Sequence, residues 1–226
     1  MRKIFIVVCM SLLSIGARAQ EQEAFAVDYD RIREAVAAEG AYDALVARLV
    51  ACDTTLEFAD LAAVYYGAAF RPGYKGSADA QQSPVGKLLK EENYQAAWSQ
   101  GLEYLRDNPV SLTTLDGMVK AAFALEMAEE TFMPYILRLT NLLDMIWCSG
   151  DGKSPETAFK VIAAADEKIL IEWMLQAEKA GEPVLLKAAC GPCDSIAIDG
   201  AENFSGEVVY FDISLPRSCA GNVSGK

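Results

Sequence analysis

Two cysteines near the end of the chain stand at the spacing of a redox-active dithiol. In a Cys-x-x-Cys motif such as Cys190-Gly-Pro-Cys193, one sulfur becomes reactive when a helix N-terminus lowers its pKa. The sequence predicts a strand before the motif, over 183–187, and alternating, strand-like residues after it instead of a helix. We therefore favour a structural turn at Gly191-Pro192, with or without a local disulfide. A thiol–disulfide oxidoreductase that uses Cys190 and Cys193 is the alternative.

The amino-acid composition excludes several kinds of catalytic site and metal site. The 226 residues contain no histidine, so Ser-His-Asp catalysis, Cys-His catalysis and histidine metal ligands are excluded. The six cysteines lack the second Cys-x-x-Cys of a structural zinc site, and we predict no metal and no cofactor. The carboxylates are many but dispersed, so a hydrolase that uses carboxylates alone remains a third reading without named residues.

A glycine-rich stretch in the middle of the chain has the residue types of a phosphate-binding loop. It runs Ser149-Gly-Asp-Gly-Lys-Ser-Pro155, but its glycine spacing is wrong, no strand precedes it and no long helix follows. We interpret it as a turn. Because the helical pattern ends here, it also predicts a division of the mature chain into a helical region, 20–148, and a smaller region, 149–226.

An aromatic block lies where a helix is expected to meet a loop. Four aromatic residues and an arginine fall within ten positions: Tyr65, Tyr66, Phe70, Arg71 and Tyr74. We expect some of these rings, Tyr65 and Phe70 first, to pack in the core. Tyrosine and arginine are also the residue types that dominate protein-binding surfaces, so these five are the candidate binding residues.

The first half of the chain is helical by its apolar period. The expected helices span 29–50, 54–68, 93–106, 111–128 and 131–148, with a loop over 71–84. Gly40 is expected to divide or bend the first, and Thr54 with Glu57 forms a capping-box pattern for the second. The stretch 94–109 and its following helix are similar to one tetratricopeptide helix pair. A full array needs about three repeats, so we expect helical hairpins of that style.

The second half reads as a small α+β unit. The pattern predicts strands over 158–162, 183–187, 195–198 and 208–213, a helix over 167–179 and a loose tail after Pro216. The fold class is therefore α+β, with N-terminal helical hairpins followed by an antiparallel sheet that carries one helix.

The first residues have the form of a secretory signal peptide. A basic start precedes an apolar run over 4–15, and Ala17-Arg-Ala19 matches a cleavage site, so we assign 1–19 as the leader. A lipoprotein acylated at Cys9 is the less favoured reading. No later apolar stretch is long enough to span a bilayer, so we expect no transmembrane segment after cleavage and an exported, periplasmic or extracellular protein.

The mature chain is strongly acidic. Removal of the leader leaves 17 basic and 32 acidic residues, a net charge of −15. Such a charge repels phosphate backbones, so we predict no nucleic-acid partner.

Three stretches carry a resemblance to a known family. They are Asp53-Thr-Thr-Leu-Glu57 with the aromatic block, the stretch from Ser149 to Ile162, and Val209-Tyr-Phe-Asp-Ile213. Together they resemble a family of secreted bacterial proteins defined as a domain of unknown function (family 4919), over nearly all of the mature chain. The resemblance implies an exported protein with a helical first half and a mixed second half. It implies no catalytic residues, and the cysteine motif is not part of the pattern.

These observations favour a non-catalytic protein over an enzyme. We expect a module of the cell envelope in which helical hairpins, the aromatic block and an acidic surface present a groove to a protein or peptide partner.

Overall fold

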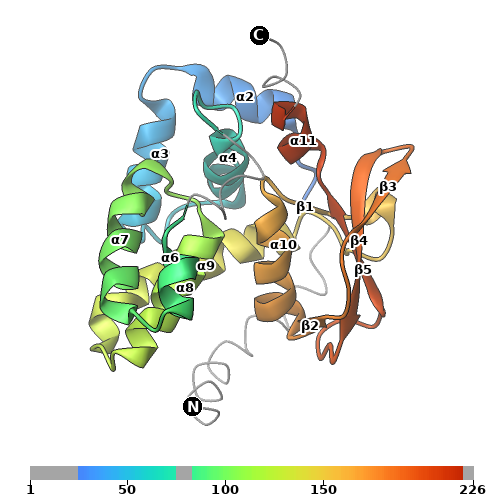
Figure 1. Cartoon of the computed structure of the whole chain (residues 1–226). Coiled ribbons are helices and arrows are strands. Elements are labelled where there is room, and N and C mark those ends of the chain that lie inside the picture. Colours follow the sequence, from blue (N-terminus) through green and yellow to red (C-terminus); the bar gives the residue numbers. More distant parts are fainter. Residues whose placement is uncertain (1–24, 75–82, 221–226) are drawn as a thin grey trace.

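The first half of the protein is helical. The computed structural model describes residues 25–74 and 83–220 (Figure 1), so the predicted leader and most of the predicted loop over 71–84 lie outside the described residues. The helices of this half are α2 (Tyr29–Ala37), α3 (Ala41–Val50), α4 (Phe58–Ala68), α6 (Val85–Lys90), α7 (Tyr94–Asp107), α8 (Leu112–Ala124) and α9 (Glu129–Trp147). They pack as pairs, with α2 and α3 on α4, α7 on α8, and α8 on α9.

The second half combines a sheet with short helices. Its elements are η3 (Pro155–Thr157), β1 (Phe159–Lys160), α10 (Ala164–Leu170), the π-helical turn η4 (Ile171–Leu175), β2 (Glu178–Lys179), β3 (Val184–Ala188), β4 (Gly191–Asp199), β5 (Val208–Asp212) and α11 (Ser214–Ala220). Figure 1 shows α10 between the helical half and the sheet. The α+β fold class predicted from the sequence is confirmed.

Side-chain caps define several helix starts. Asn93 accepts a hydrogen bond from the N–H of Ala96 at the start of α7, and Ser111 accepts one from Thr114 at the start of α8. Gly40 separates α2 from α3 in a left-handed conformation, with φ +76°. Glycine adopts this conformation without steric cost, so the expected division at this residue produces two helices.

Helix α4 begins later than its capping-box pattern predicts. Its N-cap is Glu57, whose N–H donates to the Asp60 carboxylate, and the predicted start at Thr54 is wrong. The Asp53 carboxylate instead accepts from the N–H and hydroxyl of Thr55, at 2.9 and 2.6 Å, and from Arg48 Nε at 2.8 Å. These bonds hold the residues before Glu57 in a turn.

The sheet is mixed, not purely antiparallel as predicted. Strand β4 pairs antiparallel with β5 on one side and with β3 and β2 on the other. Strand β1 pairs parallel with β5, through Phe159–Phe211 and Lys160–Asp212. The parallel pair is short, and its partners are far apart in sequence, so no local pattern marks it.

Several boundaries in the second half differ from the prediction. The hairpin turn is Ala189-Cys190, whereas Gly191 and Pro192 are the first residues of β4. The helix expected over 167–179 begins at Ala164 and ends as η4, because Gln176 takes a left-handed conformation with φ +51°. Of the tail expected after Pro216, residues 217–220 form the end of α11, and the rest lies outside the described residues.

The two halves share one apolar core. Its largest cluster combines residues of α4, α8 and α9 with residues of α10 and the sheet. Trp147 of α9 stacks on Phe159 of β1 with ring centroids 5.1 Å apart, and Phe159 packs on Phe211 of β5. The second half therefore packs directly on the helices. In the part of the chain that is described, every helix is too short or too polar to cross a bilayer.

The glycine-rich stretch 149–155 is a closed turn, as its spacing indicates. The N–H groups of Asp151 and Gly152 both donate to the Thr157 carbonyl at 2.9 Å. The turn also reaches the sheet, because the N–H of Tyr210 donates to the Gly152 carbonyl at 2.9 Å. A Cβ atom on Gly150 would lie 2.4 Å from the Thr157 carbonyl oxygen, so only glycine fits there.

Replacement of Gly150 should therefore destabilise the protein. We expect Gly150→Ala to lower the free energy of unfolding by about 1–3 kcal/mol, because the methyl group meets backbone that cannot move aside cheaply. Gly86→Ala is the control: its Cβ has no atom within 4 Å and lies in α6, so it should be neutral or stabilise by up to ~1 kcal/mol. Urea unfolding measures both; equal midpoints would contradict the close approach.

Candidate functional site

Two tyrosines of the aromatic block bind the main chain of the second half. Tyr66 is fully buried, and its hydroxyl donates to the Lys160 carbonyl at 3.1 Å. Tyr74 is half-buried, and its hydroxyl donates to the Ile162 carbonyl. These hydroxyls occupy backbone acceptors that burial would otherwise leave without partners.

Tyr65 binds the same segment through a buried carboxylate. Its hydroxyl accepts from the N–H of Ile162 at 3.2 Å and donates to Asp166 Oδ2 at 2.6 Å. The same Asp166 oxygen accepts from the N–H of Ala163 at 3.2 Å and so caps α10. Burial, and then the neighbouring carboxylate, raise the pKa of Tyr65, so its hydroxyl keeps its proton and remains a donor.

The two remaining residues of the aromatic block lie nearer the surface. Phe70 packs against Tyr29 with ring centroids 6.5 Å apart, and the Arg33 guanidinium lies 4.7 Å from the Phe70 ring centre. Arg71 lies over the Tyr42 ring at 4.9 Å. The five candidates thus divide into two fully buried tyrosines and three half-buried residues.

Arg71 and Tyr74 line a groove where the two halves meet. Its volume is about 470 Å³, and we call it the junction groove. Its lining includes Tyr42, Asp43, Arg71, Tyr74, Tyr104, Arg106, Asp107, Asn108, Pro109, Ser111, Ile162 and Asp166. The groove therefore combines the start of α3, the end of α4, the α7–α8 turn and the start of α10.

Charged side chains of both signs line the junction groove. Arg71 is fixed at the rim, because its Nη2 lies 3.3 Å from Asp43 Oδ1. Arg106 and Asp107 are exposed at the end of α7. Below the groove, Arg138 of α9 is buried and donates to the Pro109 carbonyl, and desolvation lowers its pKa to about 10. The groove thus offers a ligand cationic, anionic and phenolic groups.

Of the residues that line the groove, sequence reasoning singled out only Arg71 and Tyr74. Among those it missed, Tyr42, Tyr104 and Arg106 come from α3 and α7, and only tertiary packing brings them beside Tyr74. One signal was available for two of them. They lie just before Asn108-Pro109, where the sequence predicts that a helix ends, and residues at helix ends and loops commonly carry binding functions.

A family model for a domain of unknown function, DUF4919, matches residues 30–220. The chain belongs to this family. The match covers most of the chain, including every described residue of the junction groove, and confirms the resemblance seen in the sequence. Searches of curated proteins and of solved structures found no match.

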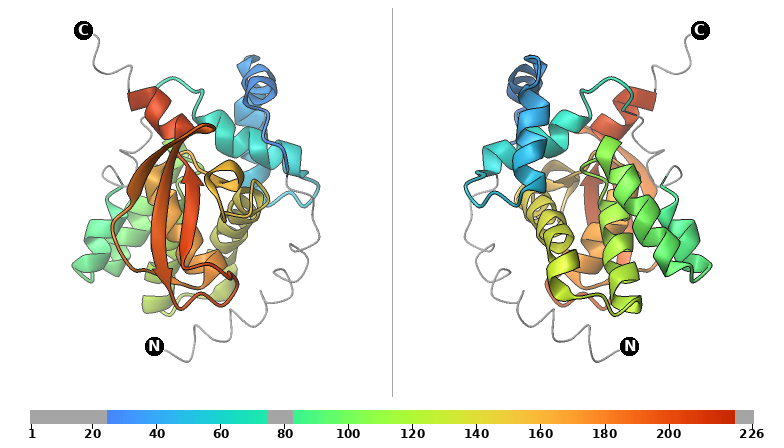
Figure 2. Two further views of the ribbon diagram at one scale, coloured as in Figure 1. Left: turned by 90° about the vertical axis from the view of Figure 1, so that its right-hand side faces the viewer. Right: turned by 90° about the vertical axis from the view of Figure 1, so that its left-hand side faces the viewer.

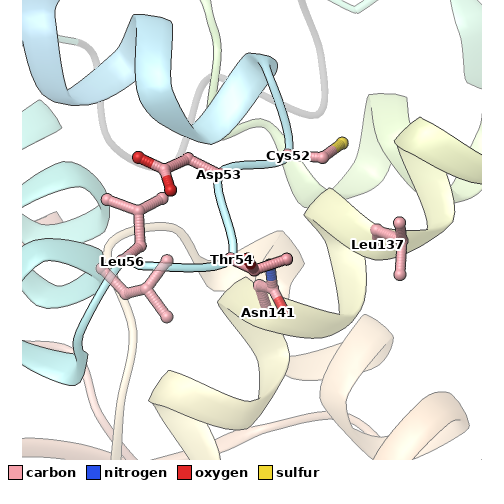
Figure 3. Close-up of a pocket in the computed structure, with 7 residues that line it drawn as sticks. Cys52, Asp53, Thr54, Leu56, Leu137 and Asn141 are labelled. Carbon is pink, nitrogen blue, oxygen red and sulfur yellow. The ribbon is translucent and has the colours of Figure 1, made fainter.

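A second, smaller pocket in this DUF4919 protein lies between the turn after α3 and helix α9 (Figure 3). Its volume is about 250 Å³, and its lining includes Cys52, Asp53, Leu137 and Asn141. Figure 3 shows the Cys52 sulfur and the Asp53 carboxylate pointing away from each other. Hydrogen bonds from Thr55 and then Arg48 lower the pKa of Asp53 to about 2. The Asp53 carboxylate is therefore not placed to accept a proton from the Cys52 thiol in this pocket.

The two cysteines of the β3–β4 hairpin in this DUF4919 protein differ in their exposure to solvent. Cys190 is exposed in the turn, and its thiol donates to the Pro155 carbonyl at 3.2 Å. Cys193 is 1% exposed within β4, and burial raises its pKa to about 11. A thiol with a raised pKa is a poor nucleophile, and the motif enters a strand instead of a helix. This geometry favours a structural turn.

A pair of buried carboxyl groups lies between α10 and β4. Glu167 is 3% exposed and hydrogen bonds to Asp194. Burial, and then the Asp194 charge, raise the pKa of Glu167 to about 8, and burial also raises that of Asp194. Neither residue lines the junction groove. Within 25–74 and 83–220, no three His, Cys, Asp or Glu side chains gather in a way that could hold a metal ion.

Loss of the Tyr65 hydroxyl should destabilise the protein more than loss of the Tyr66 hydroxyl. Tyr65→Phe removes the hydroxyl that donates to the buried Asp166 at 2.6 Å, and we expect a loss of about 2 kcal/mol in the free energy of unfolding. Tyr66→Phe removes one bond to a carbonyl and should cost about 1 kcal/mol. Chemical denaturation of both variants, with Tyr94→Phe at the half-buried first residue of α7 as control, tests this order. A Tyr65→Phe variant as stable as the control would contradict it.

The buried carboxyl pair should make stability fall as pH rises. Between pH 4.5 and about 8 the folded state keeps the Glu167 proton that the unfolded chain releases, so each pH unit removes up to roughly 1.4 kcal/mol. Glu167→Gln stays neutral and can still donate to Asp194. We expect this variant to lose much of the pH dependence in that range and to exceed the native protein in stability at pH 8.

Thermal unfolding from pH 4.5 to 8.5 measures this effect. Glu91→Gln, at an exposed position after α6, is the control and should keep the native pH dependence. Parallel curves for the native protein and Glu167→Gln would show that Glu167 is already ionised at neutral pH.

Proposed function

We propose that this DUF4919 protein is a non-catalytic module of the cell envelope that binds a protein or peptide partner in the junction groove. The observation that carries the proposal is the gathering of Tyr42, Tyr74, Tyr104, Arg71 and Arg106 around one groove of about 470 Å³. Tyrosine and arginine are the residues most enriched where binding energy concentrates. The volume is within the usual range of ligand sites.

The fixed geometry of the groove also supports binding. Arg71 is held by Asp43 and by the Tyr42 ring, and Tyr74 is held by the Ile162 carbonyl. Side chains that are already ordered lose little conformational entropy when a partner binds. A partner would therefore meet a prepared surface along one wall of the groove.

The placement of the titrating carboxyls supports a non-catalytic role. Glu167 and Asp194, whose pKa values are raised, lie between α10 and β4, and Asp144, whose pKa burial raises to about 6, lies on α9. None of the three lines the groove. Catalytic acids and bases need such pKa values at the site where substrate binds. The export of the protein to the periplasm or the extracellular space remains part of the proposal, carried by the leader pattern over 1–19.

Binding should depend on the groove residues near the end of α7. Peptides selected from a random phage-displayed library on the native protein would be synthesised and their affinities measured by fluorescence anisotropy. We expect Tyr104→Ala and Arg106→Ala each to weaken binding at least about tenfold, because residues of these types commonly contribute 1–2 kcal/mol or more at an interface.

Matched controls separate the groove from the rest of the surface. Tyr94→Ala at the other end of α7 and Arg31→Ala on α2 remove the same residue types outside the groove and should leave affinity unchanged. Selection of no binding peptide, or equal loss in groove and control variants, would contradict the proposal.

A further inference from the structure

Strand β3 is paired along one side only. Its residues pair with β4 from Val184–Ser195 to Ala188–Gly191, and no other strand in the described ranges pairs with it. Figure 1 shows β3 on the side of the molecule away from the helical half. The outer side of β3 therefore presents backbone N–H and C=O groups that are free to pair with another extended strand.

The face of β3 that points away from α10 is entirely apolar. Val184, Leu186 and Ala188 share this face, because side chains alternate along a strand. Leu185 lies on the other face, since it pairs with Asp194, whose carboxyl meets Glu167 of α10. The left view of Figure 2 shows no helix over the apolar face.

The face away from α10 is partly open within one copy. Val184 on this face is 59% exposed, whereas Leu186 and Ala188 are half-buried. Leu185, on the opposite face, is 39% exposed. An edge strand that combines open backbone groups with exposed apolar side chains is a ready surface for strand addition.

A second copy of β3 fits this edge in one antiparallel register. With the twofold axis at Leu186, each Leu186 lies opposite Leu186 of the second copy, and each Val184 lies opposite Ala188. All five residues of the strand then pair, and the face away from α10 brings only valine, leucine and alanine together. Lys187 lies opposite Leu185, so the register contains no pair of like charges.

Charge also points to a second copy at this edge. The mature chain carries a net charge of −15, so two copies repel each other over most of their surfaces. The five residues of β3 contain no acidic side chain and include the cation Lys187. Two acidic copies therefore meet here with little repulsion, along a strand whose sequence complements itself.

We propose that two copies of this chain associate through their β3 strands into one continuous antiparallel sheet. The association does not depend on the junction groove, which lies where the two halves of one chain meet. It predicts a dimer whose twofold axis passes beside Leu186.

Charge pairs at the ends of the ladder test the register. The double variants V184K/A188K and V184E/A188E place like charges opposite each other twice, whereas V184K/A188E places opposite charges there twice. Sedimentation velocity of the full mature chain over a concentration series measures the mass. We expect a dimer for the native protein and for V184K/A188E, and a twofold lower mass for both like-charge variants. Circular dichroism confirms that each variant is folded.

Hydrogen exchange of the native protein provides a test without substitution. The amides of 184–188 should gain protection as the protein concentration rises, while those of β5, already paired within one chain, should not change. A native protein that stays monomeric, equal masses for all three variants, or no concentration effect on these amides would overturn the proposal. A monomer that instead takes up an added extended peptide at β3 would assign the edge to a peptide strand and also overturn it.

Discussion

The structure depends on tyrosine hydroxyls that form hydrogen bonds with the main-chain N–H and C=O groups of the segment between the two halves. The segment 160–163 has a single short strand pairing, with β5, so most of its polar groups need other partners. Tyr66, Tyr65 and Tyr74 supply partners for the Lys160 carbonyl, the Ile162 N–H and the Ile162 carbonyl. The remaining N–H groups donate to Ser149 Oγ at 2.9 Å, to the Asp212 carbonyl at 3.3 Å and to Asp166 at 3.2 Å. Because each of these groups is engaged, the segment can lie in the core and join the helical layer to the sheet.

The same tyrosines explain how the groove is built. The hydroxyl of Tyr65 donates to the Asp166 carboxylate, which in turn caps α10. The buried Tyr65 therefore positions the start of α10, which forms one wall of the groove. Tyr74, the third of these tyrosines, is only half-buried and lines the groove directly. The candidate binding surface is thus an extension of the interface that holds the fold together. A substitution that disturbs the interface between the two halves should therefore also alter the shape of the groove, since both share these hydrogen bonds.

The sequence predicted those features that depend on neighbouring residues. The helices of the first half follow from apolar period, and Asn93 and Ser111 cap α7 and α8 where the pattern indicates a start. The start of α4 was missed because Asp53 binds Arg48 of the preceding helix. The parallel pairing of Phe159 with Phe211 was missed because it joins residues far apart in the chain. The aromatic block was singled out by residue type, but type alone does not tell a ring that binds a partner from one that binds its own chain.

The separation in sequence of the groups that the tyrosines join has a kinetic consequence. The bonds from Tyr65 reach residues 97 and 101 positions later in the chain. Folds rich in such distant contacts form slowly compared with helical bundles, since a long loop must close before the contact stabilises it. The helices α2–α9 are complete before the segment they enclose has been synthesised. Until residues 160–166 arrive, Tyr65 and Tyr66 have no backbone to bind, and the growing chain presents an open slot lined with aromatic rings. The time spent in that state, more than the final stability, sets the chance of aggregation during folding.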